Sequence, residues 1–383
     1  MRDVVVIGAG LAGLAAAIKA ADAGLSVTLI TKGVGGIQLG TGTVDILGYG
    51  PDPVEAPLDA IPAHVASRPT HPYAHVSPKQ VGASVAWLRD IVGPDALVGD
   101  ETRNVRIPTG VGALRPTCLI PPSMQAGIPQ AGARYAIVGL ARFKDFYPSL
   151  VAENLSRQSG PDGAPIKARA LSVDYVVRDG EVDSVGTVHA RSLDHEENRA
   201  RLAAQIRPLL EEGEIVGLPA VLGLDDPGAW RDLEDKLGHP VFEIPVQPPS
   251  VPGMRLNALL TRMASAKARV ILGSPLKALH GAHGRVQAVE YASAGRATRV
   301  ETRAVILAAG GFESGALELD SYGVVRDTVC ALPVMGPTGQ LLHADFWGDE
   351  QPLFLAGLAV DDSMRVVDEN GKAVYTNLFA AGG

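Results

Sequence analysis

Three glycines near the start of the chain have the spacing of a dinucleotide-binding fingerprint. Gly8, Gly10 and Gly13 follow the apolar run 3–7 and open a stretch rich in alanine and leucine that ends near Ala23. In this motif the first glycine makes a tight strand-to-helix turn, the second lets the backbone approach a pyrophosphate, and the third lets helix and strand pack closely. The N–H groups of the helix N-terminus attract the anion. Because the motif lies between a strand and a helix, it predicts a site for the ADP part of a dinucleotide.

The next strand, 26–31, ends in Thr31 and Lys32 rather than in the acidic residue that usually binds the ribose hydroxyls. A lysine at this place could accept a 2′-phosphate and so indicates NADP, whereas the threonine hydroxyl can hydrogen-bond a ribose. The rest of the chain favours flavin, because there is no second copy of the fingerprint and two late strands end in glycine pairs.

Those two late strands are 304–311, which ends in Gly310 and Gly311, and 377–383, which ends in Gly382 and a final glycine. Ligands of a doubly wound sheet lie beyond the carboxyl ends of its strands. Both glycine pairs are therefore expected near the cofactor that the N-terminal fingerprint holds.

These motifs require an α/β fold, with a Rossmann-like FAD-binding domain and a discontinuous inserted α/β domain. The nucleotide-binding domain is expected to comprise residues 1–48 and 265–383, and the inserted domain residues 49–264. The pattern predicts helices over 77–92, 146–155, 200–212 and 256–266 and strands over 135–138, 215–222, 270–272, 286–291 and 298–303. Proline and glycine make 105–131 read as a long loop and 245–252 as irregular chain.

The composition excludes several classes of protein. The chain has 383 residues and a net charge of -8, which argues against a nucleic-acid surface. Its two cysteines, Cys118 and Cys330, form no CxxC pair, so no metal site and no cysteine-ligated iron–sulfur cluster is expected. No segment approaches the roughly 20 apolar residues that span a bilayer. A soluble, cytoplasmic protein with reduced thiols is therefore expected.

Several segments resemble known flavoproteins. Residues 3–13, 29–33 and 305–311 look like the fumarate reductase and aspartate oxidase type. Further segments, running over nearly the whole chain in family order, are similar to the B subunit of anaerobic glycerol-3-phosphate dehydrogenase: 42–47, 71–73, 109–117, 194–198, 218–224 and 248–256. The Gly-Thr-Val-Asp-Ile-Leu segment at 42–47 and the Pro-Pro-Ser-Val segment that starts at Pro248 are the more specific ones. Thr31 and Lys32 are usual in that family.

The resemblance implies a role in glycerol metabolism and anaerobic respiration. A complex of three different subunits (A, B and C) oxidises sn-glycerol 3-phosphate to dihydroxyacetone phosphate and passes electrons to menaquinone, for fumarate or nitrate respiration. The partners of this chain would be the catalytic (A) and iron–sulfur (C) subunits. Any membrane attachment, at the inner face of the cell membrane, would come through a partner.

The cofactor is expected to be a flavin. The B subunit is usually assigned FMN, whereas the fingerprint favours FAD because its purpose is to hold a pyrophosphate joined to a second nucleotide. Both stay open. The residues predicted to bind the cofactor are Gly8, Gly10, Leu11, Ala12, Gly13, Thr31, Lys32, Gly33, Gly40, Thr41, Gly42, Ala309, Gly310, Gly311 and Gly382.

Oxidation of a secondary alcohol requires a base and a hydride acceptor, and a phosphate substrate calls for an arginine. Arg255 is the first candidate, ahead of Arg106 and Arg115, although each can equally be a surface or structural arginine. His195 could be a base, but a polar helix start explains it as well.

His71 and His75 flank a Pro-Tyr turn, where a structural hydrogen bond is expected. No set of residues forms an alcohol-oxidising site, so no catalytic residue is assigned. The hypothesis is that this chain relays or stores electrons and does not itself bind the substrate productively.

Two other functions stay open. The first is a stand-alone FAD-dependent dehydrogenase or reductase of another small molecule. The second is a scaffold protein of the complex that has lost its cofactor. Relatives continue past the terminal strand into a glycine-rich turn and helix that would close over the flavin, whereas this sequence ends at Gly383. The chain is therefore expected either to be a fragment or to leave the site partly open.

Overall fold

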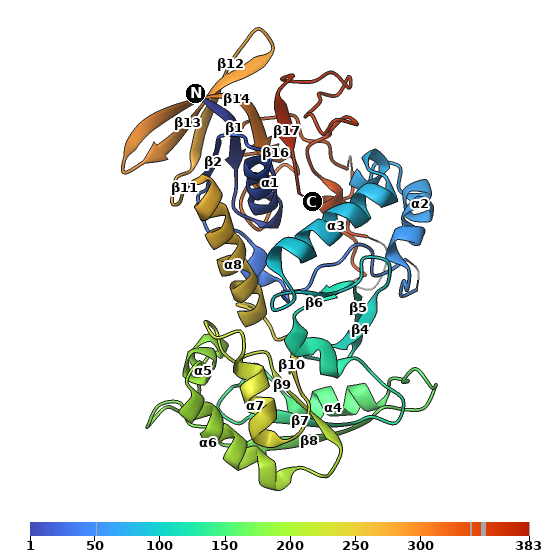
Figure 1. Ribbon diagram of the computed structural model, residues 1–383. Coiled ribbons are helices and arrows are strands. Elements are labelled where there is room, and N and C mark those ends of the chain that lie inside the picture. Colours follow the sequence, from blue (N-terminus) through green and yellow to red (C-terminus); the bar gives the residue numbers. More distant parts are fainter. Residues whose placement is uncertain (51, 338, 346–349, 383) are drawn as a thin grey trace. The chain divides into compact units, whose positions relative to one another are not determined.

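The computed structural model describes residues 1–50, 52–337, 339–345 and 350–382 (Figure 1). The chain forms two compact units. Unit 1 comprises Met1–Gly36 and Asn257–Gly383, and unit 2 comprises Ile37–Leu256. The assignment of unit 1 to nucleotide binding stays a prediction.

Unit 1 is built on a seven-stranded sheet in the order β11-β2-β1-β14-β13-β12, with β17 paired to β14. Five strands run parallel: β11 (Arg269–Ile271), β2 (Val27–Ile30), β1 (Arg2–Ile7), β14 (Arg296–Leu307) and β17 (Leu378–Ala380). The strands β13 (Arg285–Ser293) and β12 (Leu276–Ala282) continue from β14 as an antiparallel meander. Helix α1 (Leu11–Asp22) follows β1, and a short pair, β15 (Leu317–Leu319) and β16 (Val325–Asp327), precedes β17.

The apolar runs of the sequence form the centre of this sheet. Every residue of β2 and the last four of β1 are buried, as expected for parallel strands covered on both faces. The expected strands 298–303 and 304–311 are a single strand, β14, whose first half pairs with β13 and whose second half pairs with β1. The single strand β14 therefore joins the antiparallel part of the sheet, β12 and β13, to its parallel part.

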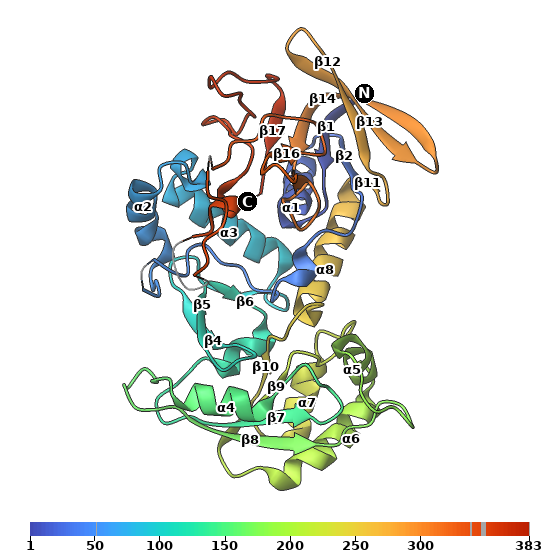
Figure 2. The same ribbon diagram turned by 180° about the vertical axis from the view of Figure 1, so that it is seen from behind.

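Unit 2 contains a parallel sheet in the order β10-β9-β7-β8. Its strands are β7 (Arg134–Leu140), β8 (Lys167–Val173), β9 (Glu214–Pro219) and β10 (Val241–Ile244), and its helices are α4 (Pro148–Ser156), α5 (Gly186–Leu193), α6 (Glu196–Ile206) and α7 (Ala229–Leu237). Figures 1 and 2 show α4 on one face of the sheet and α6 with α7 on the other. Right-handed crossovers require this, because the chain moves one way across the sheet through α4 and back through α6 and α7.

The core of this sheet is closed by aromatic packing. The rings of Tyr135 and Phe242 meet edge to face, with centroids 5.7 Å apart.

The remainder of unit 2 holds α2 (Pro57–Ser67), α3 (Pro78–Val92), the pair β3 (Val98–Gly99) with β6 (Leu119–Ile120), and the hairpin of β4 (Val105–Pro108) and β5 (Leu114–Thr117). Helix α8 (Val251–Lys267) contains the second boundary between the units.

The structure corrects three expectations for single elements. The segment 105–131 is not a long loop, because it contains β4, β5, β6 and a 3₁₀ helix over Pro122–Gly127. The helix expected over 200–212 is α6, which begins at Glu196 and ends at Ile206. The proline-rich stretch 245–252 is irregular only as far as Ser250, because α8 already begins at Val251. A proline in the first helical turn needs no N–H donor and so starts a helix without cost.

Candidate functional site

The fingerprint glycines are held by close backbone packing. Gly8 has φ +107°, and a Cβ on it would lie 2.1 Å from the carbonyl oxygen of Ala308. A Cβ on Gly13 would lie 2.0 Å from the carbonyl oxygen of Gly8. Real Cβ atoms do not approach backbone oxygens so closely, so both positions require glycine. They fix the turn between β1 and α1 against the end of β14.

Gly10 differs from the other two glycines. Among the residues that the structure describes, a Cβ on Gly10 would meet no atom within 4 Å, so the space beside it is open. Gly10 is also the N-cap of α1, and no side chain caps the free N–H groups of that helix. Open space beside uncapped N–H groups suits a pyrophosphate. The residues present therefore fit the ADP part of a dinucleotide.

The carboxyl ends of three strands meet at this turn. The amide of Ala308 donates to the carbonyl of Ile7 over 2.8 Å, and the amide of Ala381 donates to the carbonyl of Leu307 over 2.9 Å. A Cβ on Gly382 would lie 3.7 Å from the Cβ of Ala12. One end of the unit 1 sheet thus gathers nine of the predicted cofactor residues: Gly8, Gly10, Leu11, Ala12, Gly13, Ala309, Gly310, Gly311 and Gly382. The last glycine, Gly383, lies outside the described residues.

The end of β2 brings three more predicted residues to the same end of the sheet. Thr31 is buried, and its hydroxyl donates to the carbonyl of Gly33 over 2.5 Å. The oxygen of that hydroxyl can still accept a hydrogen bond, whereas Lys32 and Gly33 are exposed. A Cβ on Gly35 would lie 2.3 Å from the carbonyl oxygen of Ala9, so the loop after β2 packs directly against the backbone of the fingerprint turn. The spacing of the sequence did not single out Gly35.

The predicted residues Gly40, Thr41 and Gly42 belong to unit 2. The segment that contains them packs on the start of α8, since a Cβ on Gly42 would lie 2.7 Å from the Cβ of Pro252. A Cβ on Gly253 would lie 2.6 Å from the carbonyl oxygen of Gly40. The two helix residues and this loop therefore hold one another in place. Contact of the loop with a cofactor stays a prediction.

The contacts of Arg255 favour a structural role. Its guanidinium donates to the Glu243 carboxylate over 2.7 and 3.0 Å and to the carbonyl of Leu222 over 2.9 Å. It also donates to the carbonyl of Gly223. The Glu243 side chain is fully buried and further accepts the hydroxyl of Ser123 over 2.7 Å. These partners occupy the guanidinium, so its donors are directed into the protein.

The two other candidate arginines lie on the same hairpin and differ in their surroundings. Arg106, on β4, is exposed. Arg115, on β5, donates to the hydroxyls of Thr41 and Thr43 over 3.2 Å each and forms an ion pair with Asp45. The sequence did not identify these partners of Arg115.

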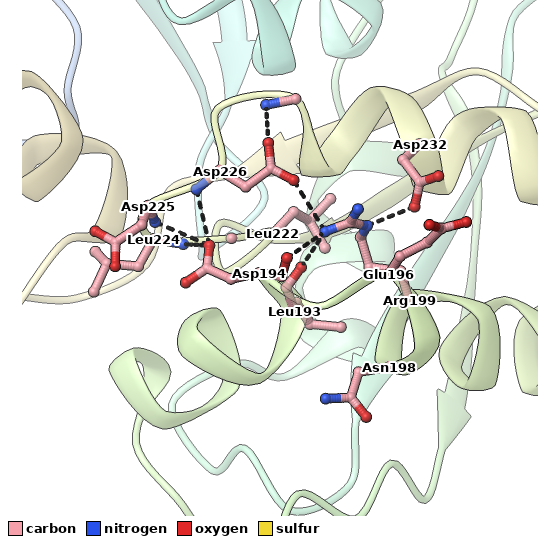
Figure 3. Close-up of polar contacts among 12 residues, drawn as sticks. Leu193, Asp194, Glu196, Asn198, Arg199, Leu222, Leu224, Asp225, Asp226 and Asp232 are labelled. Carbon is pink, nitrogen blue, oxygen red and sulfur yellow. Dashed lines mark hydrogen bonds and ion pairs between the residues drawn. The ribbon is translucent and has the colours of Figure 1, made fainter.

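Figure 3 shows the structural contacts of Asp194 and Arg199, which lie on either side of His195 in the sequence. His195 is the N-cap of α6, without a side-chain capping bond, so the helix-start interpretation holds for its position. The carboxylate of Asp194 accepts the amides of Leu224, Asp225 and Asp226 over 2.8 to 2.9 Å. The buried guanidinium of Arg199 pairs with Asp226 and Asp232. The segment 194–198 therefore joins the start of α6 to the loop after β9.

Other candidate groups have structural contacts as well. The Nδ1 atom of His71 accepts the amide of Tyr73 over 3.1 Å, which is the structural hydrogen bond expected at this turn. Cys118 and Cys330 are free thiols, and burial raises the pKa of each to about 12. Among the residues that the structure describes, no group of His, Cys, Asp and Glu could hold a metal ion, and no helix is long and apolar enough to cross a membrane.

Comparison with known proteins adds to this geometry. The family model described as an FAD binding domain matches residues 3–383. The chain is 32% identical, over 99% of its length and 90% of the relative's, to a probable B subunit of anaerobic glycerol-3-phosphate dehydrogenase from Halobacterium salinarum. It is 29% identical, over 99% of its length and 91% of the relative's, to the B subunit of the anaerobic glycerol-3-phosphate dehydrogenase of Pectobacterium atrosepticum.

Among solved structures, the chain is similar to a 3-ketosteroid delta1-dehydrogenase from Sterolibacterium denitrificans. The identity is 17% and the TM-score 0.37, and the match covers 82% of this chain and 48% of that one. The sequence matches over nearly the whole length identify the family. The chain belongs to the FAD-binding-domain family and, within it, is a homologue of the B subunit of anaerobic glycerol-3-phosphate dehydrogenase.

Proposed function

We propose that this chain is the flavin-containing subunit of a respiratory glycerol-3-phosphate dehydrogenase. The complex would oxidise sn-glycerol 3-phosphate to dihydroxyacetone phosphate and pass the electrons towards menaquinone, in fumarate or nitrate respiration. Its partners would be the catalytic (A) and iron–sulfur (C) subunits of the same complex. The observation that carries the proposal is the similarity, over 99% of the chain, to proteins named as the B subunit of this enzyme.

The fingerprint favours FAD as the cofactor. Gly10 and the N-terminus of α1 would hold its pyrophosphate, and the hydroxyl of Thr31 would accept a hydrogen bond from the ribose. When bound, the flavin would supply a group that accepts electrons and passes them on. FMN, which has no second nucleotide, would leave the fingerprint without its usual ligand.

In the proposed division of labour, this chain stores or relays electrons and its catalytic partner oxidises the substrate. The contacts of Arg255 support this division, because its guanidinium belongs to a buried structural network, and the position of His195 is explained by the start of α6. The complex would act at the inner face of the cell membrane, to which a partner would attach it.

A turnover assay tests this proposal. The purified chain, loaded with FAD, would be given sn-glycerol 3-phosphate and an artificial electron acceptor, alone and with its catalytic and iron–sulfur partners. The expected result is turnover only in the reconstituted complex, and its loss when this chain is omitted. Substantial turnover by the chain alone would contradict the relay role and favour a stand-alone dehydrogenase. Full turnover without this chain would remove it from the reaction.

A further inference from the structure

Unit 2 contains a polar cluster that includes Thr41, and the proposed function gives it no role beyond the predicted contact of Thr41 with the cofactor. We name it the Arg115 cluster, and it consists of Thr41, Thr43, Asp45 and Arg115. The Nη1 atom of Arg115 donates to both threonine hydroxyls over 3.2 Å, and its Nη2 atom donates to the Asp45 carboxylate. The two hydroxyls are 2.8 Å apart and hydrogen-bonded to each other. A cation, a carboxylate and two hydroxyls are thus joined in one network.

The fold holds this cluster in a fixed arrangement. Val44 forms an antiparallel bridge with Leu119, so the chain around it is extended and Thr43 and Asp45 share one side. The intervening Val44 is buried, and its carbonyl accepts the hydroxyl of Thr117 over 3.2 Å and the thiol of Cys118 over 3.0 Å. Contacts of the Val44 backbone therefore position the segment, and its polar side chains accept hydrogen bonds from Arg115.

The Arg115 cluster faces solvent in part, unlike the network around Arg255. The side chains of Arg115 and Asp45 are 32% and 34% exposed. By contrast, Arg255 pairs with a carboxylate that is 0% exposed. Within the described part of the chain, the contacts of Arg115 engage its two Nη atoms, and its Nε–H remains as a further donor. A guanidinium with a spare donor, beside hydroxyls and an acceptor, can bind an incoming anion.

Stability alone does not account for the arrangement. An ion pair this exposed contributes only about 0–1 kcal/mol to the free energy of unfolding. The arrangement does match a small molecule that carries both an anionic group and hydroxyl groups. The guanidinium would bind the phosphate or carboxylate, the Asp45 carboxylate would accept a hydrogen bond from a ligand hydroxyl, and the threonine hydroxyls could do either.

We infer that the Arg115 cluster is a binding site for a small hydroxylated organic anion. Arg115 recognises the anionic group and Asp45 recognises a hydroxyl. The choice of sn-glycerol 3-phosphate as the first probe rests on the proposed function, but the inference about the site does not. Binding here is compatible with the relay role, because this chain can bind a ligand without oxidising it.

Calorimetric titration of the flavin-loaded chain tests the inference with three probes: sn-glycerol 3-phosphate, D-glycerate and inorganic phosphate. The variants are Arg115→Ala, Arg115→Lys and Asp45→Asn. The matched control is Arg106→Ala, which removes the same charge from the exposed neighbouring strand of the hairpin. Flavin content and the unfolding midpoint of each variant show whether the chain is still folded.

Arg115→Ala is expected to weaken the binding of the preferred hydroxylated anion at least tenfold, and Arg115→Lys to weaken it less. Asp45→Asn is expected to weaken that ligand at least threefold while leaving inorganic phosphate unchanged or tighter. Arg106→Ala should bind like the unaltered protein. Equal losses in Arg115→Ala and Arg106→Ala, unchanged binding in Arg115→Ala, or no binding of any hydroxylated anion by the unaltered chain would overturn the inference.

The probes separate this inference from the proposed function. Arg115-dependent binding of D-glycerate without binding of sn-glycerol 3-phosphate would support the site and leave the proposed substrate to be tested by the turnover assay of the complex. Tight binding of sn-glycerol 3-phosphate that Arg115→Ala leaves unchanged would overturn the Arg115 cluster as the site and leave the proposed function standing.

Discussion

At the scale of single residues, the three fingerprint glycines have different roles. Gly8 and Gly13 are required by the protein's own backbone, because a Cβ on either would collide with a carbonyl oxygen. A Cβ on Gly10 would meet no atom of the described residues, so their packing does not require glycine there. The fingerprint therefore separates into two positions that the fold requires to be glycine and one, Gly10, whose role in binding a ligand is a prediction.

Gly10→Ala is predicted to lower the affinity for FAD at least tenfold with little effect on stability. Its methyl group would enter the space where the pyrophosphate is expected, whereas no neighbouring atom would have to move. FAD titration and urea unfolding of the cofactor-free protein measure the two effects. Gly357→Ala is the control, because a Cβ there also meets no atom of the described residues within 4 Å. Unchanged FAD binding by Gly10→Ala would place the pyrophosphate elsewhere.

His189 makes the stability of unit 2 depend on pH. Its side chain is fully buried beside Ser184, and burial lowers its pKa from 6.5 to about 4. The unfolded chain therefore takes up a proton near pH 6.5, whereas the folded chain does so only near pH 4. The stabilisation is complete above pH 6.5 and is lost as the pH falls towards 4.

The expected loss in the free energy of unfolding is about 2 kcal/mol between pH 7.5 and pH 5. Urea unfolding at the two pH values measures it, and the same measurement on His189→Gln removes the background from other groups. The difference between the two pH values should shrink in the variant. An equal difference in both proteins would show that His189 does not titrate in this way.

At the scale of elements, buried charge joins β10 to the start of α8. Glu243 on β10 is surrounded by Arg255, Ser123 and the amide of Leu222, which follows β9. Arg255→Ala would leave this carboxylate buried without its cation, at a cost on the order of 3–5 kcal/mol in the free energy of unfolding.

Urea unfolding measures that cost, and Arg115→Ala is the comparison, with an expected cost of about 0–1 kcal/mol. The double variant Glu243→Gln with Arg255→Met should recover part of the loss. A cost below about 1 kcal/mol for Arg255→Ala, together with weaker binding of sn-glycerol 3-phosphate, would instead support Arg255 as a substrate-binding residue.

The sequence predicted the elements that carry strong local patterns. The apolar runs before Gly8 and Gly310 and the alanine-rich helix α1 lie where expected, because burial on both faces leaves a continuous apolar run. The segment 105–131 was missed because its strands have two to four residues, too few to show a period, and contain prolines. Its pairing also depends on distant residues, as in the bridge between Val44 and Leu119.

The candidate site, like the fold, could be predicted from the sequence only where its residues form a local motif. The fingerprint has a fixed spacing, so its residues could be named from the sequence. Arg255 and Arg115 could not be told apart, because the difference lies in partners that are 12 and 70 residues away along the chain. Whether a guanidinium is directed inwards or partly towards solvent is settled only by packing.

At the scale of the whole molecule, the chain combines an FAD-binding-family fold with a second α/β unit. In unit 1, the carboxyl ends of the parallel strands meet at one glycine-rich turn. Unit 2 has its own parallel sheet and core. The net charge of -8 argues against a nucleic-acid surface. The central claim is that this chain holds FAD.

The visible spectrum of the purified protein, with mass identification of the ligand released by denaturation, tests this claim most directly. A flavin absorption band and release of FAD are the predicted results. Release of FMN would contradict the interpretation of the fingerprint. A colourless protein that also fails to take up added FAD would contradict the account as a whole and make a scaffold without a cofactor the better description.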